Sequence, residues 1–216
     1  AGLKADKKGS RIAAEGIVNY YEDDNFSLIL ELNSETDFVA RDDNFISLAT
    51  FISEKLLKSD ISNAKEEIDN EISSVISKLG EKIQLRRYKK IQKNNFVFGY
   101  SHNNKISSLV ELKNKDDLLA KDICMQIVAS NPLSLDEASL DAEILKSEKE
   151  IYKKELEKLD KKEDIKRNIL DGKMKKFISE NTLLNQPFVK DPSTSLSKII
   201  KDNEIISFIR YEVGEG

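Results

Sequence analysis

The segment 28–42 is similar to the segment 80 residues later, 108–122. Internal similarity of this kind indicates that one supersecondary unit is present twice. The repeat constrains the fold more than any other feature, because the architecture must contain two similar units in the same order. The similar pairs are 28–32 (LILEL) with 108–112 (SLVEL), 37–42 (DFVARD) with 117–122 (DLLAKD), and 83–88 (IQLRRY) with 206–211 (ISFIRY).

The hydrophobic pattern predicts what each unit contains. Two strand-like runs flank the polar segment 22–25 (EDDN), which has the length of a hairpin turn. Helical spacing follows, and Gly80 stands where a helix would end. We therefore predict an α+β fold with two similar subdomains, each a small antiparallel sheet with flanking helices. The elements expected in the first unit are strands at 17–21 and 26–32, helices at 45–57 and 68–79, and a strand at 83–91.

The second unit is longer, and residues 136–178 account for the difference. Within them, residues 141–167 hold nine basic and nine acidic residues. A charged break at 160–163 (DKKE) separates two helical patterns, which predicts an antiparallel helical hairpin, or short coiled coil, that projects from the body. A single surface helix with a solvated face is the alternative. The apolar positions at sevenfold spacing are Leu145, Tyr152 and Leu159.

These patterns divide the chain into three parts. Residues 1–15 are expected to be a linker, and residues 16–92 an N-terminal core subdomain. Residues 93–216 are expected to form a C-terminal core subdomain that carries the helical hairpin insert 136–178.

The composition of the chain disfavours several classes of protein. Its 216 residues include 35 Lys and Arg against 39 Asp and Glu, so no basic excess indicates nucleic-acid binding. The single cysteine, Cys124, excludes an internal disulfide and is expected to be a buried thiol, because it lies in an apolar stretch. No run reaches 18 apolar residues, and residues 1–11 lack the apolar core of a signal peptide. We expect a cytoplasmic protein that binds neither a membrane nor nucleic acid directly.

The sequence offers little for catalysis. His102 is the only histidine, and it lies in a different element from Cys124. A metal site built on histidine and cysteine needs more ligands at closer spacing, and no phosphate-binding glycine motif occurs. We expect no catalytic residues, no metal and no cofactor, and thus no enzyme. Taken alone, His102 is expected to be an exposed turn residue without a role.

A polar segment after the first hairpin carries a large aromatic side chain, Phe38. Ser34, Thr36 and Asp37 suit the N-cap of a helix, because their side-chain oxygens accept hydrogen bonds from free amides. Phe38 either folds under the sheet, as we expect of its repeat counterpart Leu118, or is held out for another molecule. Spacing alone favours the buried position.

The segment 36–42 (TDFVARD) resembles the T-D-F-V-A-[RK]-N signature of the translation elongation factor Ts family. Asp42 replaces the usual Asn, and Lys161-Lys162 stands where the family often has a Gly-Lys-Pro turn. The family also has a small N-terminal domain before the linker in which this chain is expected to begin. Other segments that resemble the family, in the same order, are 11–16 (RIAAEG), 79–87 (LGEKIQLRR), 100–102 (YSH), 174–177 (MKKF), 186–189 (QPFV) and 208–216 (FIRYEVGEG).

The resemblance implies a guanine-nucleotide exchange factor. Such a factor binds the GTPase elongation factor Tu in its GDP form and promotes GDP release by disturbing the Mg²⁺ and phosphate site. A homodimer, or a heterotetramer with the partner, is compatible with the family. The alternatives are an RNA- or ribosome-associated module that uses the charged hairpin, and a structural protein that self-associates through it.

The resemblance also implies which residues contact the partner. Phe38 becomes a side chain held in solvent for entry into the GTPase, and Asp37 either fixes the helix start or touches the partner. The residues implied in this contact are Thr36, Asp37, Phe38 and Val39, with further contacts at Leu79 and His102.

Overall fold

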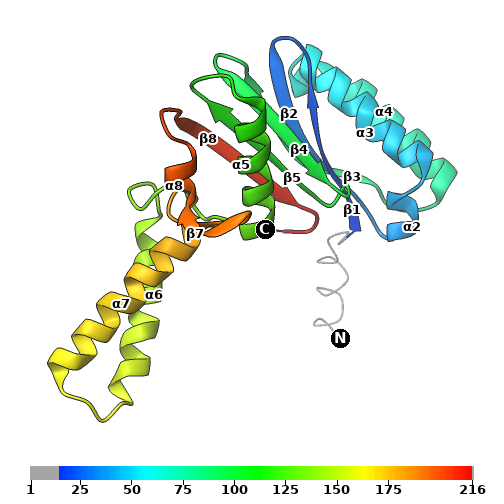
Figure 1. Cartoon of the computed structure of the whole chain (residues 1–216). Helices are drawn as coiled ribbons and strands as arrows, with labels where there is room; N and C mark the ends of the chain where they lie inside the picture. Colours follow the sequence, from blue (N-terminus) through cyan, green and yellow to red (C-terminus); the bar gives the residue numbers. More distant parts are fainter. Residues whose placement is uncertain (1–14, 216) are drawn as a thin grey trace, which may run out of the picture.

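Two three-stranded antiparallel sheets form the body of the protein in the computed structural model, which describes residues 15–215 (Figure 1). The expected linker lies outside the described residues, except for Glu15, which is the first residue of a strand. The first sheet has the order β1 (Glu15–Glu22), β2 (Phe26–Ser34), β3 (Gln84–Gln92), and the second has the order β4 (Phe96–His102), β5 (Ile106–Leu112), β8 (Ile205–Glu212).

The repeat is confirmed in the sheets. The matching segments are the central strands β2 and β5, and each has a register shift at the same place, after Glu31 and after Glu111. Glu31 pairs with Arg87, whereas Glu111 pairs with Ser207. The sequence alignment that matched Arg87 to Arg210 is therefore wrong by three residues. The alternating residues of β3 and β8 can be aligned at several offsets. Only the pairing of each strand with its central strand shows which residues are equivalent.

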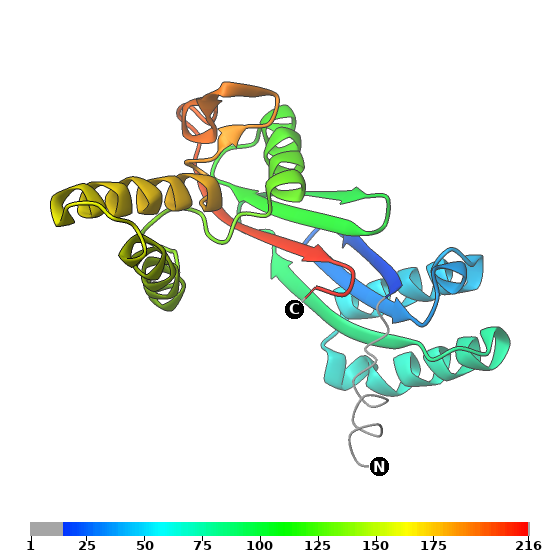
Figure 2. The same ribbon diagram turned by 90° about the horizontal axis from the view of Figure 1, so that it is seen from below.

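Helices cover the outer faces of the two sheets, so that the sheets lie between them (Figure 2). The predicted helices are confirmed, and Gly80 ends α4 in the left-handed conformation, at φ 74°. The first core is formed by the side chains of β2 that face the helices, together with the fully buried Phe45. In the second core, Cys124 is buried against β5, as expected. The helices are α3 (Asp43–Lys58) and α4 (Ile61–Leu79) on the first sheet, and α5 (Asp117–Ser130) on the second.

The predicted hairpin is confirmed as two helices, α6 (Ala142–Glu157) and α7 (Glu163–Asn181), which project from the body (Figure 1). Leu156 is the buried residue of α6, and Lys173 of α7 lies 4.8 Å from the ring centre of Tyr152. The expected seam residue Leu159 instead follows α6 and is exposed, because the helix ends two residues before it. No helix among residues 15–215 is both long and apolar enough to cross a membrane. Elements that the sequence did not predict are β6 (Pro187–Phe188), β7 (Asp191–Ser195) and α8 (Leu196–Ile199).

The inner faces of the two sheets meet through close and partly polar contacts. The Ser107 hydroxyl of β5 donates to the Val18 carbonyl of β1 at 2.8 Å, and the Val18 amide donates to the Asn104 carbonyl at 2.9 Å. Gly99 of β4 lies directly against the ring of Tyr20, and a Cβ at this position would overlap the ring. The two sheets can therefore approach closely only with glycine here.

A carboxylate with no exposed surface, Glu31, lies at this interface. It accepts hydrogen bonds from Arg87 Nε at 2.6 Å, from Asn33 Nδ2 at 2.9 Å and from the Gly214 amide at 2.8 Å. Arg86 Nη1 also lies 3.1 Å from Glu31 Oε1. Burial alone would raise the pKa of Glu31, but these donors and the charge of Arg87 lower it below the usual value. Since Gly214 follows β8, Glu31 ties the first sheet to the end of the second.

We predict that Glu31→Gln lowers the free energy of unfolding by about 3–5 kcal/mol at pH 7, because it removes the buried negative charge that pairs with the guanidinium group of Arg87. The folded pKa of Glu31 lies below the unfolded value of about 4.3, so the stability it contributes is complete above that value. This contribution is lost as the pH falls through the folded pKa. Urea unfolding from pH 7 to pH 3 measures it.

The difference between the parent chain and Glu31→Gln should shrink as the pH falls below about 4. The exposed Glu66 of α4 offers a matched control, and Glu66→Gln should follow the parent at every pH. Equal acid slopes for the parent and Glu31→Gln would contradict the assignment of this pH dependence to Glu31.

Candidate partner-binding site

A short helix, α2 (Asp37–Ala40), carries Phe38 at the end of β2. Its N-cap is Thr36, whose hydroxyl oxygen accepts from the Val39 amide at 3.4 Å. Consecutive helical residues point about 100° apart, so the turn that buries Val39 and Ala40 directs Phe38 into solvent. Phe38 is 82% exposed. The expectation from spacing, that it folds under the sheet, is therefore wrong.

Leu118, the repeat counterpart of Phe38, is also exposed, at 80%. The expectation that it is buried is wrong for the same geometric reason. Asp116 caps α5 by accepting from the Leu119 amide at 3.0 Å, and Ala120 takes the buried position. This second exposed tip begins near Glu22, at the other end of β1 from α2 (Figure 1).

The N-cap of α2 is Thr36, and the structure gives Asp37 a different contact. The Asp37 carboxylate forms an ion pair with Arg41 one helical turn later, at 2.9 Å, in which Arg41 is largely exposed and Asp37 partly exposed. Exposed pairs of this kind contribute little stability. Asp42 then caps α3, and hydrogen bonds from the Asn44 side chain and amide lower the pKa of Asp42. Aspartate thus serves at this helix start as the usual Asn would.

The turn that bears Phe38 is joined to the segment after α4. The Thr36 amide donates to Glu81 Oε2 at 3.0 Å, and the Thr36 hydroxyl donates to Glu81 Oε1 at 2.7 Å. In the opposite direction, the Lys82 amide donates to Glu35 Oε1 at 3.2 Å. We call these contacts the Glu81 brace. Sequence patterns did not single out Glu81, because neither periodicity nor composition marks a carboxylate whose partner lies 45 residues away.

Leu79 and His102, the other two expected contact residues, lie in separate elements. Leu79 is the last residue of α4 and is half-buried against the first core. His102 is the exposed last residue of β4, as expected, with Nδ1 3.0 Å from the Tyr100 hydroxyl and Nε2 3.3 Å from Asn103 Nδ2.

These residues lie at one end of the first sheet. The β4–β5 turn after His102 contacts the start of β1, where Lys105 Nζ lies 2.8 Å from Glu15 Oε2. Glu15 pairs with Ser34, the residue from which the Phe38 turn departs. The end of α4 joins the same group through the Glu81 brace. We call the group formed by Thr36–Val39, Leu79 and His102 the tip surface.

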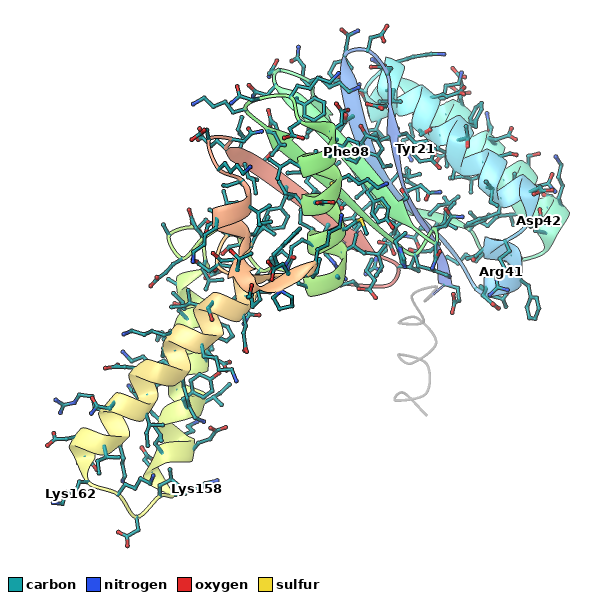
Figure 3. All side chains as sticks on the ribbon, in the orientation of Figure 1. Tyr21, Arg41, Asp42, Phe98, Lys158 and Lys162 are labelled. Carbon is teal, nitrogen blue, oxygen red and sulfur yellow. The ribbon has the colours of Figure 1, made fainter. Side chains whose placement is uncertain are left out.

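Figure 3 shows the distance between the tip surface and the hairpin. Arg41 and Asp42 lie at the α2 end of the molecule, whereas Lys158 and Lys162 lie at the far turn of the α6–α7 hairpin. The two features therefore face different regions of space.

The described residues show an inert thiol and an exposed apolar side chain. Burial raises the pKa of the Cys124 thiol to about 12, so it is inert as a nucleophile. Among residues 15–215, no three or more histidine, cysteine, aspartate or glutamate side chains group closely enough to hold a metal ion. What the tip surface presents is one large apolar side chain on a braced turn.

Comparison with known proteins identifies relatives over nearly the whole chain. A sequence model of the family described as "Elongation factor TS" matches residues 35–215. A protein named Elongation factor Ts from Legionella pneumophila (strain Philadelphia 1) is 39% identical over 227 residues, covering 99% of this chain and 78% of that protein. Proteins of the same name from Halothermothrix orenii and Saccharophagus degradans are 41% and 39% identical, covering 98% and 100% of this chain and 78% of each relative.

We predict that Phe38→Ala leaves the folded state nearly as stable as the parent, because an 82% exposed ring contributes little to the core. Phe45 provides the matched comparison, since it is fully buried. Phe45→Ala should lower the free energy of unfolding by about 3–5 kcal/mol. Urea titration followed by circular dichroism gives both values. A comparable loss in Phe38→Ala would show that the ring packs inside its own chain.

Proposed function

The chain belongs to the elongation factor Ts family of translation elongation factors, and on this premise we propose that it promotes release of GDP from the GTPase elongation factor Tu. The observation that carries the proposal is the exposure of Phe38 on a short, capped and braced helix. The aromatic ring is held away from its own core although a sheet and a helix pair with apolar faces lie beside it.

Nucleotide exchange requires differential binding and no reactive group. A factor that binds the empty GTPase better than the GDP-bound form must, by linkage, be expelled by the nucleotide to the same degree. The tip surface suits this task because its groups form contacts and transfer no atoms. We propose that the chain works without a catalytic residue or a cofactor of its own.

Phe38 can supply much of the differential free energy. Burial of one phenylalanine side chain contributes about 1.5–3 kcal/mol, and about 1.4 kcal/mol corresponds to a factor of ten. Because the ring is 82% exposed in the free chain, nearly all of its surface remains available for burial in the partner. Entry of this ring alone would then change nucleotide affinity by about tenfold to a hundredfold.

We propose that the ring enters beside the Mg²⁺ and phosphate site of the partner. An apolar ring offers no ligand to Mg²⁺, so its presence there would displace groups that hold the ion and the phosphates. The neighbours of Phe38 then take different parts. Val39 is buried and supports the turn from below, Thr36 caps it, and Asp37 remains exposed enough to touch the partner.

Leu79 and His102 would extend this contact, because they lie at the same end of the molecule as α2. Leu79 offers a half-exposed apolar side chain, and His102 offers an exposed imidazole fixed by Tyr100 and Asn103. A contact surface with several separated anchors fixes the orientation in which Phe38 approaches.

We also propose that residues 16–92 and 93–216 act as two subdomains, with residues 136–178 inserted in the second. The short connection between β3 and β4 falls at the proposed boundary. The charges of the hairpin are largely matched, for example by Lys153 with Glu150 and Lys173 with Glu155. Such pairing disfavours direct binding of nucleic acid, which requires clustered cations. We place the protein in the cytoplasm, with elongation factor Tu as its partner.

We predict that Phe38→Ala lowers the stimulated rate of GDP release by tenfold or more, because the variant lacks the ring whose burial favours the empty GTPase. The measurement is release of a fluorescent GDP from elongation factor Tu, with increasing amounts of the parent or the variant. Leu118→Ala is the matched control, because it removes an equally exposed side chain at the equivalent repeat position and should leave the rate unchanged.

Equal losses in Phe38→Ala and Leu118→Ala would contradict the assignment of the entering side chain to Phe38. A parent chain that does not accelerate release at all would overturn the proposed function itself.

A further inference from the structure

Within the Glu81 brace, the carboxylate of Glu81 accepts two hydrogen bonds from the tip surface and so joins that surface to the segment after α4. A carboxylate has two oxygens that only accept, and here both are used by Thr36, one by its amide and one by its hydroxyl. Bidentate binding by an ionised acceptor is stronger and more directional than a single neutral hydrogen bond. Resting on the proposed function, we propose that Glu81 is a positioning residue that holds the Phe38 turn in the conformation that enters the partner.

Glu81 also determines which way the hydroxyl of the cap residue Thr36 is oriented. A threonine hydroxyl carries one hydrogen, and in this structure that hydrogen points to Glu81. A lone pair of the same oxygen is then free to accept from the Val39 amide. Glu81 therefore acts through Thr36 on the first turn of α2, and so on the direction in which Phe38 leaves that turn.

The chain geometry before Glu81 supports this role. Gly80 ends α4 at φ 74°, a left-handed conformation that is strained for a residue with a side chain. This turn brings the segment 81–82 back toward the end of β2, where Lys82 meets Glu35 in the reverse direction. The segments 35–36 and 81–82 thus each supply a carboxylate that accepts from the other segment.

The second repeat unit shows that the fold can build this turn without such a brace. Its cap residue, Asp116, accepts from the Leu119 amide with its own carboxylate. The segment before β8 instead holds Asn114, two residues earlier, through paired hydrogen bonds of 3.0 Å with Asn203. Of the two tips, the one that bears Phe38 has its cap residue, Thr36, hydrogen-bonded by a residue from another segment, whereas at the other tip the corresponding contact is made to Asn114 and not to the cap residue Asp116. This difference links the brace to presentation of Phe38 rather than to formation of the strand–helix turn.

The physical benefit is a lower ordering cost at the moment of binding. A loop and a side chain that are already fixed lose less conformational entropy when they enter a partner. Loss of the brace should therefore slow stimulated release by about threefold to tenfold, less than loss of the ring itself. The folded core should be unaffected, because Glu81 is only half-buried and its hydrogen bonds are made to Thr36.

The test combines a measurement on the free chain with a double-mutant cycle. In the free chain, Glu81→Ala should speed hydrogen exchange of the Thr36 and Val39 amides, the two donors that the brace fixes, without changing the melting temperature. Thr36→Ser retains the amide and the hydroxyl that donate to Glu81, so both amides should exchange as slowly as in the parent. Glu66→Gln on the exposed face of α4 should change nothing.

In the release assay, Glu81→Ala should lower the rate in the parent background and cause no further loss in the Phe38→Ala background, because it acts through that ring. Additive losses, or unchanged exchange at Thr36 and Val39, would overturn the positioning role while the proposed function stands. A parent chain that is inactive in release would overturn the proposed function, and with it any role of the brace in exchange. The amide measurement would still report whether Glu81 orders the turn.

Discussion

The arrangement of the two repeat units depends on one buried charge, the carboxylate of Glu31. A charge without exposed surface destabilises a fold unless donors compensate it, and here they come from both sheets. Arg87 reaches it from β3 and Gly214 from the segment after β8. Arg87 also lies 4.1 Å from the ring centre of Tyr211 and donates to the Glu212 carbonyl at 3.0 Å. These contacts fix the units relative to each other and place the β4–β5 turn beside the end of β2.

The end of β2 is where the two units have diverged. Both continue from the central strand into a capped helix, and both expose an apolar side chain at its second residue, Phe38 or Leu118. In the first unit the helix stops after four residues, and Glu81 holds the cap residue Thr36. In the second, α5 continues for 14 residues against the sheet. One tip therefore carries an exposed aromatic ring on a hydrogen-bonded turn, and the other is the start of a covering helix.

The sequence predicted most helices and strands because their hydrophobic periods are regular. It predicted the repeat because the two central strands, β2 and β5, have similar apolar residues. Interactions between distant segments left no such signal. Glu31 resembled an ordinary polar residue in an apolar strand, and the Glu81 contact joins two loops. Spacing alone predicted buried positions for Phe38 and Leu118 and was wrong for both, whereas the family resemblance implied an exposed Phe38, which the structure confirms. The first turn of a helix is too short to show a period. Its direction is set by the cap residue Thr36 or Asp116.

The central claim, that Phe38 enters the nucleotide site of the partner, is tested most directly by photo-crosslinking from position 38. A chain carrying p-benzoylphenylalanine in place of Phe38 is mixed with elongation factor Tu, illuminated, and the attachment site is mapped by mass spectrometry. The account predicts attachment to the loops that hold the phosphates and Mg²⁺, with a yield that falls as GDP is added, since nucleotide and factor expel each other. Attachment elsewhere on the partner, or a yield that GDP does not change, would contradict it.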